Sequence, residues 1–171
     1  MTRYAIIMGV SGCGKTSVGE GLAQITGIRF MDGDALHPKA NIDKMSAGIP
    51  LTDEDRWPWL ERIGREFAKS PVPLIIGCSA LKRGYRDLIR HHAGAMVSFI
   101  HLSGSRQIIA RRTQARKGHF MPPALLDSQF AALEPPTADE NSVSINIDQP
   151  LATIIAQAAR HLEGKAPRLG K

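Results

Sequence analysis

The chain has 171 residues, of which 43% are apolar, and this length suits one globular domain and leaves no room for a second. Its apolar runs are strand-length, far short of the roughly 20 residues that a membrane-spanning helix needs, and no small-residue cleavage site follows the N-terminus, so we expect a cytoplasmic protein without a signal peptide. The formal charge of +6 favours an anionic partner, such as a nucleotide, an acidic metabolite, a nucleic acid or a membrane surface, without choosing among them.

Short runs rich in Ile, Val, Phe and Leu predict five β-strands, and helical patterns separate them. The expected strands cover residues 4–8, 28–31, 72–77, 96–102 and 143–147. The expected helices cover residues 15–26, 38–47, 52–69, 81–91, 105–117, 122–132 and 150–162. Thr52 and Asp55 have the spacing of a capping box, whereas Pro58 predicts a break or a restart soon afterwards. Residues 163–171 are rich in Gly, Pro and basic residues and predict a disordered tail.

This alternation of strands and helices predicts an α/β fold in one domain over residues 1–162, with a five-stranded parallel sheet and helices on both faces. In such a sheet, ligands bind at the carboxyl ends of the strands. The three motifs described next each follow a predicted strand. We therefore expect them to share one edge of the sheet.

A phosphate-binding pattern follows the first strand, because residues 9–16 match G-x-x-x-x-G-K-[ST] between a strand and a helix. In this motif consecutive backbone N–H groups form an anion site at a helix N-terminus. The expected nucleotide-binding residues are Gly9, Val10, Ser11, Gly12, Cys13, Gly14, Lys15 and Thr16. Lys15 is expected to act catalytically on the β- and γ-phosphates, and Thr16 to bind Mg²⁺. The alternative is an ordinary glycine-rich turn. A chance match to the whole pattern, however, is expected in only about one in a hundred chains of this length.

Two rival uses of this loop lack their own signals. The guanine-binding signature Asn-Lys-x-Asp does not occur, since residues 41–44 read Asn-Ile-Asp-Lys. The third strand ends in Gly77-Cys78-Ser79, without the terminal Asp of a motor-type ATPase. Another carboxylate must therefore complete the metal site.

Asp32 and Asp34 leave the second strand, which we expect to lie beside the first, so that both carboxylates can project toward the γ-phosphate. One can hold the metal while the other orients the acceptor hydroxyl, since phosphoryl transfer passes through a loose transition state. We assign Asp32 to the metal and Asp34 to the substrate and to catalysis, because Asp34 lies further past the strand. Reversed roles and a simple Asx turn are the alternatives. His37 either contacts the substrate or is a structural turn histidine.

Three cations, Lys82, Arg83 and Arg86, follow the third strand at a predicted helix start, where positive charge is unfavourable unless an anion binds. Lys82 and Arg86 are four residues apart and could clamp a substrate carboxylate, so we assign all three to substrate binding. A solvated basic helix face is the competing interpretation.

Arg112 and Arg116 follow Ile108 at a spacing of four, so they continue an apolar stripe and predict catalytic cations that meet an anion. Residues 116–122 combine a glycine hinge with a proline stop, and we expect a mobile lid over about residues 116–136. His119 in this segment is expected to contact the substrate rather than to act as a base. An arginine-rich helix surface is the alternative.

Together these residues resemble the gluconokinases of the phosphate-loop type, which are similar in fold to shikimate and nucleoside monophosphate kinases. The resemblance covers nearly the whole chain and rests, besides the loop, on residues 31–38, 41–59, 78–83, 118–121, 128–130 and 133–136. It implies a P-loop kinase fold, ATP and Mg²⁺ as cofactors, D-gluconate as the acceptor, 6-phospho-D-gluconate as the product, and often a homodimer. Cys13 replaces the family's usual small residue, which changes no role because the backbone binds the phosphates there.

Three alternatives remain open: a kinase for another acid such as shikimate, a polynucleotide 5′-kinase, and a non-catalytic nucleic-acid-binding module. Aromatic residues make up only 5% of the chain and no nucleic-acid-binding motif occurs, which argues against the last two. We therefore expect neither a nucleic acid nor a membrane among the partners.

Overall fold

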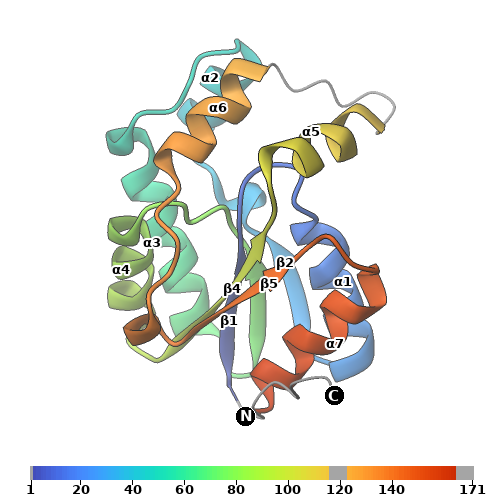
Figure 1. The fold of residues 1–171 in the computed structure, drawn as a ribbon. Helices are drawn as coiled ribbons and strands as arrows, with labels where there is room; N and C mark the ends of the chain where they lie inside the picture. The colour runs from blue at the N-terminus through green and yellow to red at the C-terminus, as the bar shows by residue number, and fades with distance from the viewer. Residues whose placement is uncertain (1, 116–122, 165–171) are drawn as a thin grey trace.

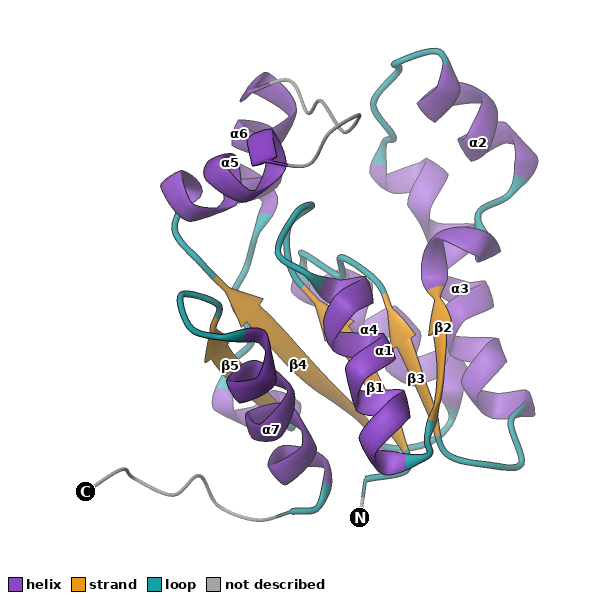
Figure 2. Ribbon diagram, turned by 90° about the vertical axis from the view of Figure 1, so that its right-hand side faces the viewer, coloured by secondary structure: helices purple, strands orange, loops and turns teal. Residues whose placement is uncertain are grey.

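The computed structural model describes residues 2–115 and 123–164. Within them, one parallel sheet runs through the middle of the fold (Figure 1), and its strand order is β2-β3-β1-β4-β5 (Figure 2). The strands are β1 (Tyr4–Met8), β2 (Arg29–Asp32), β3 (Leu74–Gly77), β4 (Val97–Ser103) and β5 (Ser142–Asn146). The predicted α/β fold with a five-stranded parallel sheet is confirmed.

The expected position of the second strand is wrong, because β2 pairs with β3 and not with β1. All residues of β3 are buried, whereas β2 has two exposed and two half-buried residues. A central parallel strand is covered on both faces and needs a continuous apolar run. The polar ends of β2, Arg29 and Asp32, therefore suit the edge of the sheet.

Every predicted helix is present, with bounds that differ by at most two residues within the described part of the chain. The helices are α1 (Lys15–Thr26), α2 (Lys39–Ser46), α3 (Asp53–Lys69), α4 (Arg83–Ala93), α5 (Arg106–Ala115), α6 (Pro123–Ala132) and α7 (Leu151–Leu162), with 3₁₀ turns η1 (Gly33–Leu36) and η2 (Ala138–Glu140). Thr52 and Asp55 form the predicted capping box of α3. Pro58 was expected to break or restart this helix, but α3 continues through it. The carbonyl of Glu54, which loses its partner at Pro58, belongs to an exposed residue that water can reach.

The sheet carries a core on each face because neighbouring strand residues point to opposite sides. Ala5 and Ile7 of β1 join the core beneath α1 and α7, while Tyr4, Ile6 and Met8 join the core beneath α3 and α4. Figures 1 and 2 show these helix pairs on opposite sides of the sheet. The layers leave the carboxyl ends of the strands open for a site.

Three further helices, α2, α5 and α6, lie beyond the carboxyl ends of the strands in both views (Figures 1 and 2). Leu126 anchors α6 in the core beneath α1 and α7, and α5 contributes Ile109 to the same cluster. The predicted lid includes residues 116–122, which lie outside the described residues, so lid motion stays a prediction. No helix in the described ranges is long and apolar enough to cross a membrane.

Candidate active site

The phosphate-binding loop joins β1 to α1, as its motif predicts. Gly12 has φ 84°, and a Cβ atom there would lie 2.7 Å from the Thr113 hydroxyl oxygen of α5, so the loop requires glycine at this position. The Lys15 ammonium donates to the carbonyls of Gly9 at 3.0 Å and Val10 at 3.1 Å. Thr16 is exposed on the first turn of α1. The backbone amides and these two side chains can therefore serve an anionic ligand and its metal.

One cavity of about 320 Å³ borders this loop on the side of α7. Its lining residues are Gly12, Cys13, Gly14, Ser17, Val18, Arg112, Ala115, Leu151 and Ile154. Arg112, one of the predicted catalytic cations, donates a hydrogen bond to the Ile147 carbonyl and so lies between the loop and the end of β5. The mostly apolar walls beside a phosphate-binding loop suit a nucleotide base.

The acidic turn is pinned to the end of β3. A Cβ atom at Gly33 would lie 2.5 Å from the Gly77 carbonyl oxygen, so only glycine permits this approach. Trp59 of α3 donates to the Gly33 carbonyl at 2.8 Å, and Asp32 accepts from the Asp34 amide at 2.9 Å. These contacts bring the turn toward the phosphate-binding loop although β2 does not adjoin β1.

The surroundings of Asp34 change the pKa of its carboxyl group. Asp34 is exposed at the surface, but the protein around its carboxyl group desolvates it in part; this desolvation, and after it the charge of Asp32, raise the pKa of Asp34, while the nearby Lys15 opposes this rise. Asp34 is thus close enough to Lys15 to feel its charge. A carboxylate with a raised pKa beside the phosphate-binding lysine is suited to accept a proton from an attacking hydroxyl.

His37 is buried against protein rather than presented to a ligand. Its ring stacks on Trp59 with centroids 4.0 Å apart, and its Nδ1 accepts from Asn41 at 3.2 Å. Burial, and secondly the charge of Arg56, lower its pKa to about 4. A neutral, stacked imidazole fits the structural alternative better than the predicted substrate contact.

A second cavity, of about 360 Å³, lies between the start of α3, the start of α4, and α6. Its lining residues are Pro50, Leu51, Thr52, Asp53, Arg56, Ser79, Leu81, Lys82, Tyr85, Leu125, Ser128, Gln129 and Ala132. We call it the acceptor cavity. Its hydroxyl and amide side chains suit a polyol, since such groups can exchange hydrogen bonds with substrate hydroxyls.

Charge in the acceptor cavity comes from Arg56, Lys82 and Asp53, which together leave one positive charge. The Lys82 ammonium lies 3.2 Å from both oxygens of Asp53. Hydrogen bonds from Tyr85 and then from Lys82 lower the pKa of Asp53, so this carboxyl stays ionised. The Arg56 guanidinium lies 5.8 Å from the centre of the Tyr85 ring. One net positive charge matches an acceptor that carries a single carboxylate.

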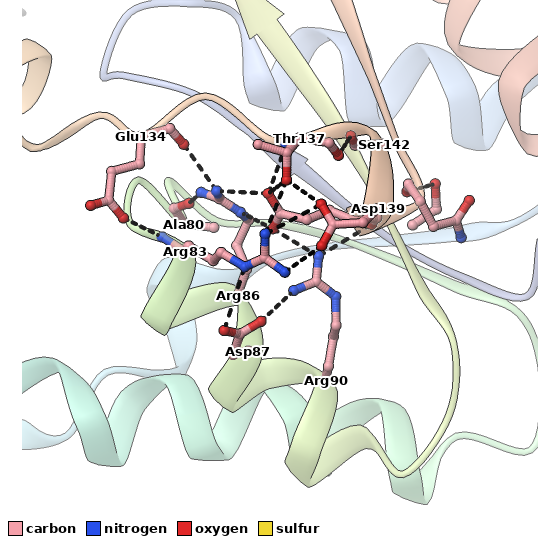
Figure 3. A network of polar contacts seen from close by, with 12 residues as sticks. Ala80, Arg83, Arg86, Asp87, Arg90, Glu134, Thr137, Asp139 and Ser142 are labelled. Atoms are coloured by element: carbon pink, nitrogen blue, oxygen red, sulfur yellow. Dashed lines mark hydrogen bonds and ion pairs between the residues drawn. The ribbon is translucent and has the colours of Figure 1, made fainter.

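Arg86 does not face this cavity, and its expected role in a carboxylate clamp is wrong. It is fully buried, and it donates to both carboxylate oxygens of Glu140 at 2.8 and 3.1 Å. It also donates to the carbonyls of Ala80 and Glu134 (Figure 3) and to that of Leu81. These contacts engage all five of its N–H groups. Lys82 precedes the first residue of α4, so the spacing of four does not place the two side chains on one helix face.

Arg83 is likewise engaged with protein. Its guanidinium donates to Asp139 at 2.6 Å and to the Thr137 hydroxyl at 3.0 Å, and its backbone N–H donates to the Glu134 carboxylate (Figure 3). It does not line the acceptor cavity. The cation pattern predicts an anion at the start of α4. For Arg83 this anion is the carboxylate of Asp139, which belongs to the protein itself.

Two predicted site residues, Arg116 and His119, lie outside the described residues. In their place the structure brings forward Arg56 and Gln129, which line the acceptor cavity and were not assigned a role from the sequence. Arg56 follows three acidic residues, Asp53, Glu54 and Asp55, in the first turn of α3, so its charge gave no reason to expect an external anion. Gln129 lies within residues 128–130, which carry part of the family resemblance, but its position alone indicates no role.

Comparison with known proteins agrees with this geometry. A family model described as an AAA domain matches residues 5–136. The thermosensitive gluconokinase of Escherichia coli strain K12 is 50% identical over 157 residues, which cover 89% of this chain and 83% of the relative. The gluconokinase of Gluconobacter oxydans strain 621H is 43% identical over 166 residues, covering 95% and 93%. The crystal structure of a gluconokinase from Sinorhizobium meliloti 1021 matches with a TM-score of 0.87 and 49% identity, covering 94% of this chain and 91% of that one.

Proposed function

Because the chain belongs to the gluconokinase family, we propose that it transfers the γ-phosphoryl group of ATP to D-gluconate and forms 6-phospho-D-gluconate. The observation that carries this proposal is a pair of cavities: one borders the phosphate-binding loop, and the other contains Gln129, which bonds to Ser11 of that loop. One has apolar walls for a nucleotide base, and the other is polar with one net positive charge. A donor and an acid acceptor can thus meet at the loop.

On the donor side, Lys15 binds the β- and γ-phosphates, the amides of residues 9–16 cradle them, and Arg112 contacts the nucleotide. A bound magnesium ion would neutralise part of the phosphate charge. Thr16 and Asp32 would hold it: both are exposed oxygen-bearing residues near the carboxyl ends of β1 and β2. No three His, Cys, Asp or Glu side chains converge as a metal site within residues 2–115 and 123–164, so phosphate and water oxygens complete the ligands.

On the acceptor side, Asp34 accepts a hydrogen bond from the attacking hydroxyl and orients it. Arg56 and Lys82 bind the carboxylate of gluconate, and Tyr85 and Ser128 line the space for its hydroxyl groups. Phosphoryl transfer then needs little further chemistry from the protein, because positioning and charge stabilisation supply most of the rate enhancement.

Replacing Arg56 or Lys82 with glutamine is expected to raise the KM for gluconate by about 10- to 100-fold, the scale of one charge-assisted hydrogen bond. Each change removes a cation that binds the substrate carboxylate, so the ratio of kcat/KM for gluconate to that for uncharged glucose should fall. Steady-state kinetics with both sugars measure this. Arg83→Gln is the matched control and should leave the KM unchanged, because Arg83 pairs with Asp139 outside the cavity. An unaltered acid preference in both test variants would remove the clamp from the proposal.

Asp32→Asn is expected to raise the Mg²⁺ concentration for half-maximal rate by about tenfold, because it removes a charge that holds the metal through water. Titration of the rate with Mg²⁺ at saturating ATP and gluconate measures this shift. Asp34→Asn is the control and should keep the wild-type midpoint. A metal defect confined to Asp34→Asn would show that the two roles are reversed.

We further propose, on the family resemblance, that the enzyme works in the cytoplasm as a homodimer with a mobile lid. Three apolar side chains of α2 and the loop after it are about half exposed, with exposed fractions of 47% for Ile42, 45% for Met45 and 51% for Ile49. Such surface can be covered by a partner. Sedimentation equilibrium tests the dimer.

A further inference from the structure

One side chain connects the acceptor cavity to the phosphate-binding loop. The Gln129 carboxamide of α6 accepts from the Ser11 amide N–H at 2.7 Å and donates from its NH₂ group to the Ser11 hydroxyl at 3.0 Å. The two residues are 118 positions apart in the sequence. Gln129 also lines the acceptor cavity beside Ser128. It therefore touches both the donor loop and the space for the acceptor.

The position of Ser11 along the loop indicates which phosphate of a bound nucleotide it would face. Gly12, Cys13 and Gly14 border the cavity for the base, whereas Ser11 meets a wall residue of the acceptor cavity. The γ-phosphate must lie between base and acceptor, so Ser11 is on its side of the loop. Backbone N–H groups of such loops donate to phosphate oxygens. The Gln129 oxygen thus holds a donor that a γ-phosphate oxygen can use.

Building on the proposed kinase function, we propose that Gln129 is a positioning residue. Its bond to Ser11 changes when a γ-phosphate is bound, and this change alters the position of α6 over the acceptor. With ADP, the carboxamide keeps the Ser11 N–H. With ATP, the γ-phosphate competes for that N–H and displaces the Gln129 carboxamide from it. Because Gln129 is on α6, this exchange sets the position of the helix that closes one side of the acceptor cavity.

Two substitutions separate this role from simple packing. Gln129→Glu has the same shape and keeps an oxygen for the Ser11 N–H, but its charge repels a γ-phosphate, so it should weaken ATP binding by about tenfold more than ADP binding. Gln129→Ala frees the Ser11 N–H and should shift the ATP-to-ADP preference in the opposite direction, toward ATP, by about threefold. Gln129→Ala should also lower kcat with gluconate, because α6 loses its contact with the loop.

The test is calorimetric titration of Mg·ATP and Mg·ADP into the full chain without gluconate. Gln157→Glu is the matched control and should leave the affinity ratio unchanged, since Gln157 is exposed on α7 and lines neither cavity. Equal ATP-to-ADP ratios in wild type, Gln129→Glu and Gln129→Ala would overturn the proposal. This readout needs no acceptor, so it stays distinct from a failure of the wild type to phosphorylate gluconate.

Discussion

Asp34→Asn is expected to lower kcat by about 10²- to 10⁴-fold, the usual scale for a positioned proton acceptor, while the Kd for ATP stays nearly unchanged. Asparagine keeps the size of the side chain but cannot take the proton or hold the attacking hydroxyl as strongly. Steady-state kinetics give kcat, and calorimetry gives the Kd. Asp32→Asn is the control at the same turn, and its rate should recover at high Mg²⁺. Wild-type kcat in Asp34→Asn would remove Asp34 from the chemistry.

The same carboxyl predicts the acid side of the pH profile. Only ionised Asp34 can accept a proton, so activity should rise with pH through its pKa. Burial and the charge of Asp32 raise that pKa, so the rise should fall above the ordinary value for aspartate, which is about 3.9. The Asp34→Asn variant should lose this dependence in kcat. A profile with the same acid limb in both proteins would assign it to another group.

Glu140→Ala is expected to lower the free energy of unfolding by about 3–5 kcal/mol, because it leaves the buried Arg86 guanidinium without its counter-charge. Both side chains are about 1% exposed. Glu140 further accepts from Arg90 and from the Thr137 backbone N–H, so one substitution loosens α4, η2 and the loop between α6 and η2. Denaturant titration measures the loss.

The control is Asp139→Ala, which removes the neighbouring carboxylate from an exposed pair with Arg83. Its free energy of unfolding, measured by the same denaturant titration, should stay close to that of the wild type, because exposed ion pairs contribute little.

The stability that Glu140 supplies depends on pH. Burial of Glu140 disfavours its charge, but hydrogen bonds from Arg86, Thr137 and Arg90 outweigh this and lower its pKa to about 2. The stability from Glu140 is therefore complete above the unfolded pKa of about 4.3 and is lost as pH falls toward 2. Equal stability of the two variants would contradict the assigned role of the buried pair.

Local sequence signals predicted the parts of the site that are built from neighbouring residues. The step from β1 through the loop to α1 follows from its glycines and from the lysine at the helix start, and the capping box at Thr52 follows from spacing alone. The continuous apolar run of β1 accounts for the two cores, because its successive side chains point to opposite faces of the sheet. In these places backbone preference and burial favour the same structure.

Contacts between distant segments could not be predicted in this way. Arg86 and Glu140 are 54 positions apart, and a cation near a helix start fits an internal carboxylate as well as a substrate. The edge position of β2 depends on which strand takes the centre, and the sequence does not state this directly. Gln129 meets Ser11 only because α6 folds back over the loop. The pairing of charges across the fold therefore decided which cations remain for an acceptor.

Acceptor-dependent ADP release from the purified chain tests the central proposal most directly. Gluconate, shikimate, glycerate, idonate and nucleoside monophosphates are compared at saturating Mg·ATP. Gluconate should give the highest kcat/KM, by about 100-fold over shikimate and the nucleotides, because the acceptor cavity pairs one net positive charge with groups for several hydroxyls. A higher kcat/KM for another acceptor, or ADP release that does not depend on an acceptor, would contradict the assignment of gluconate.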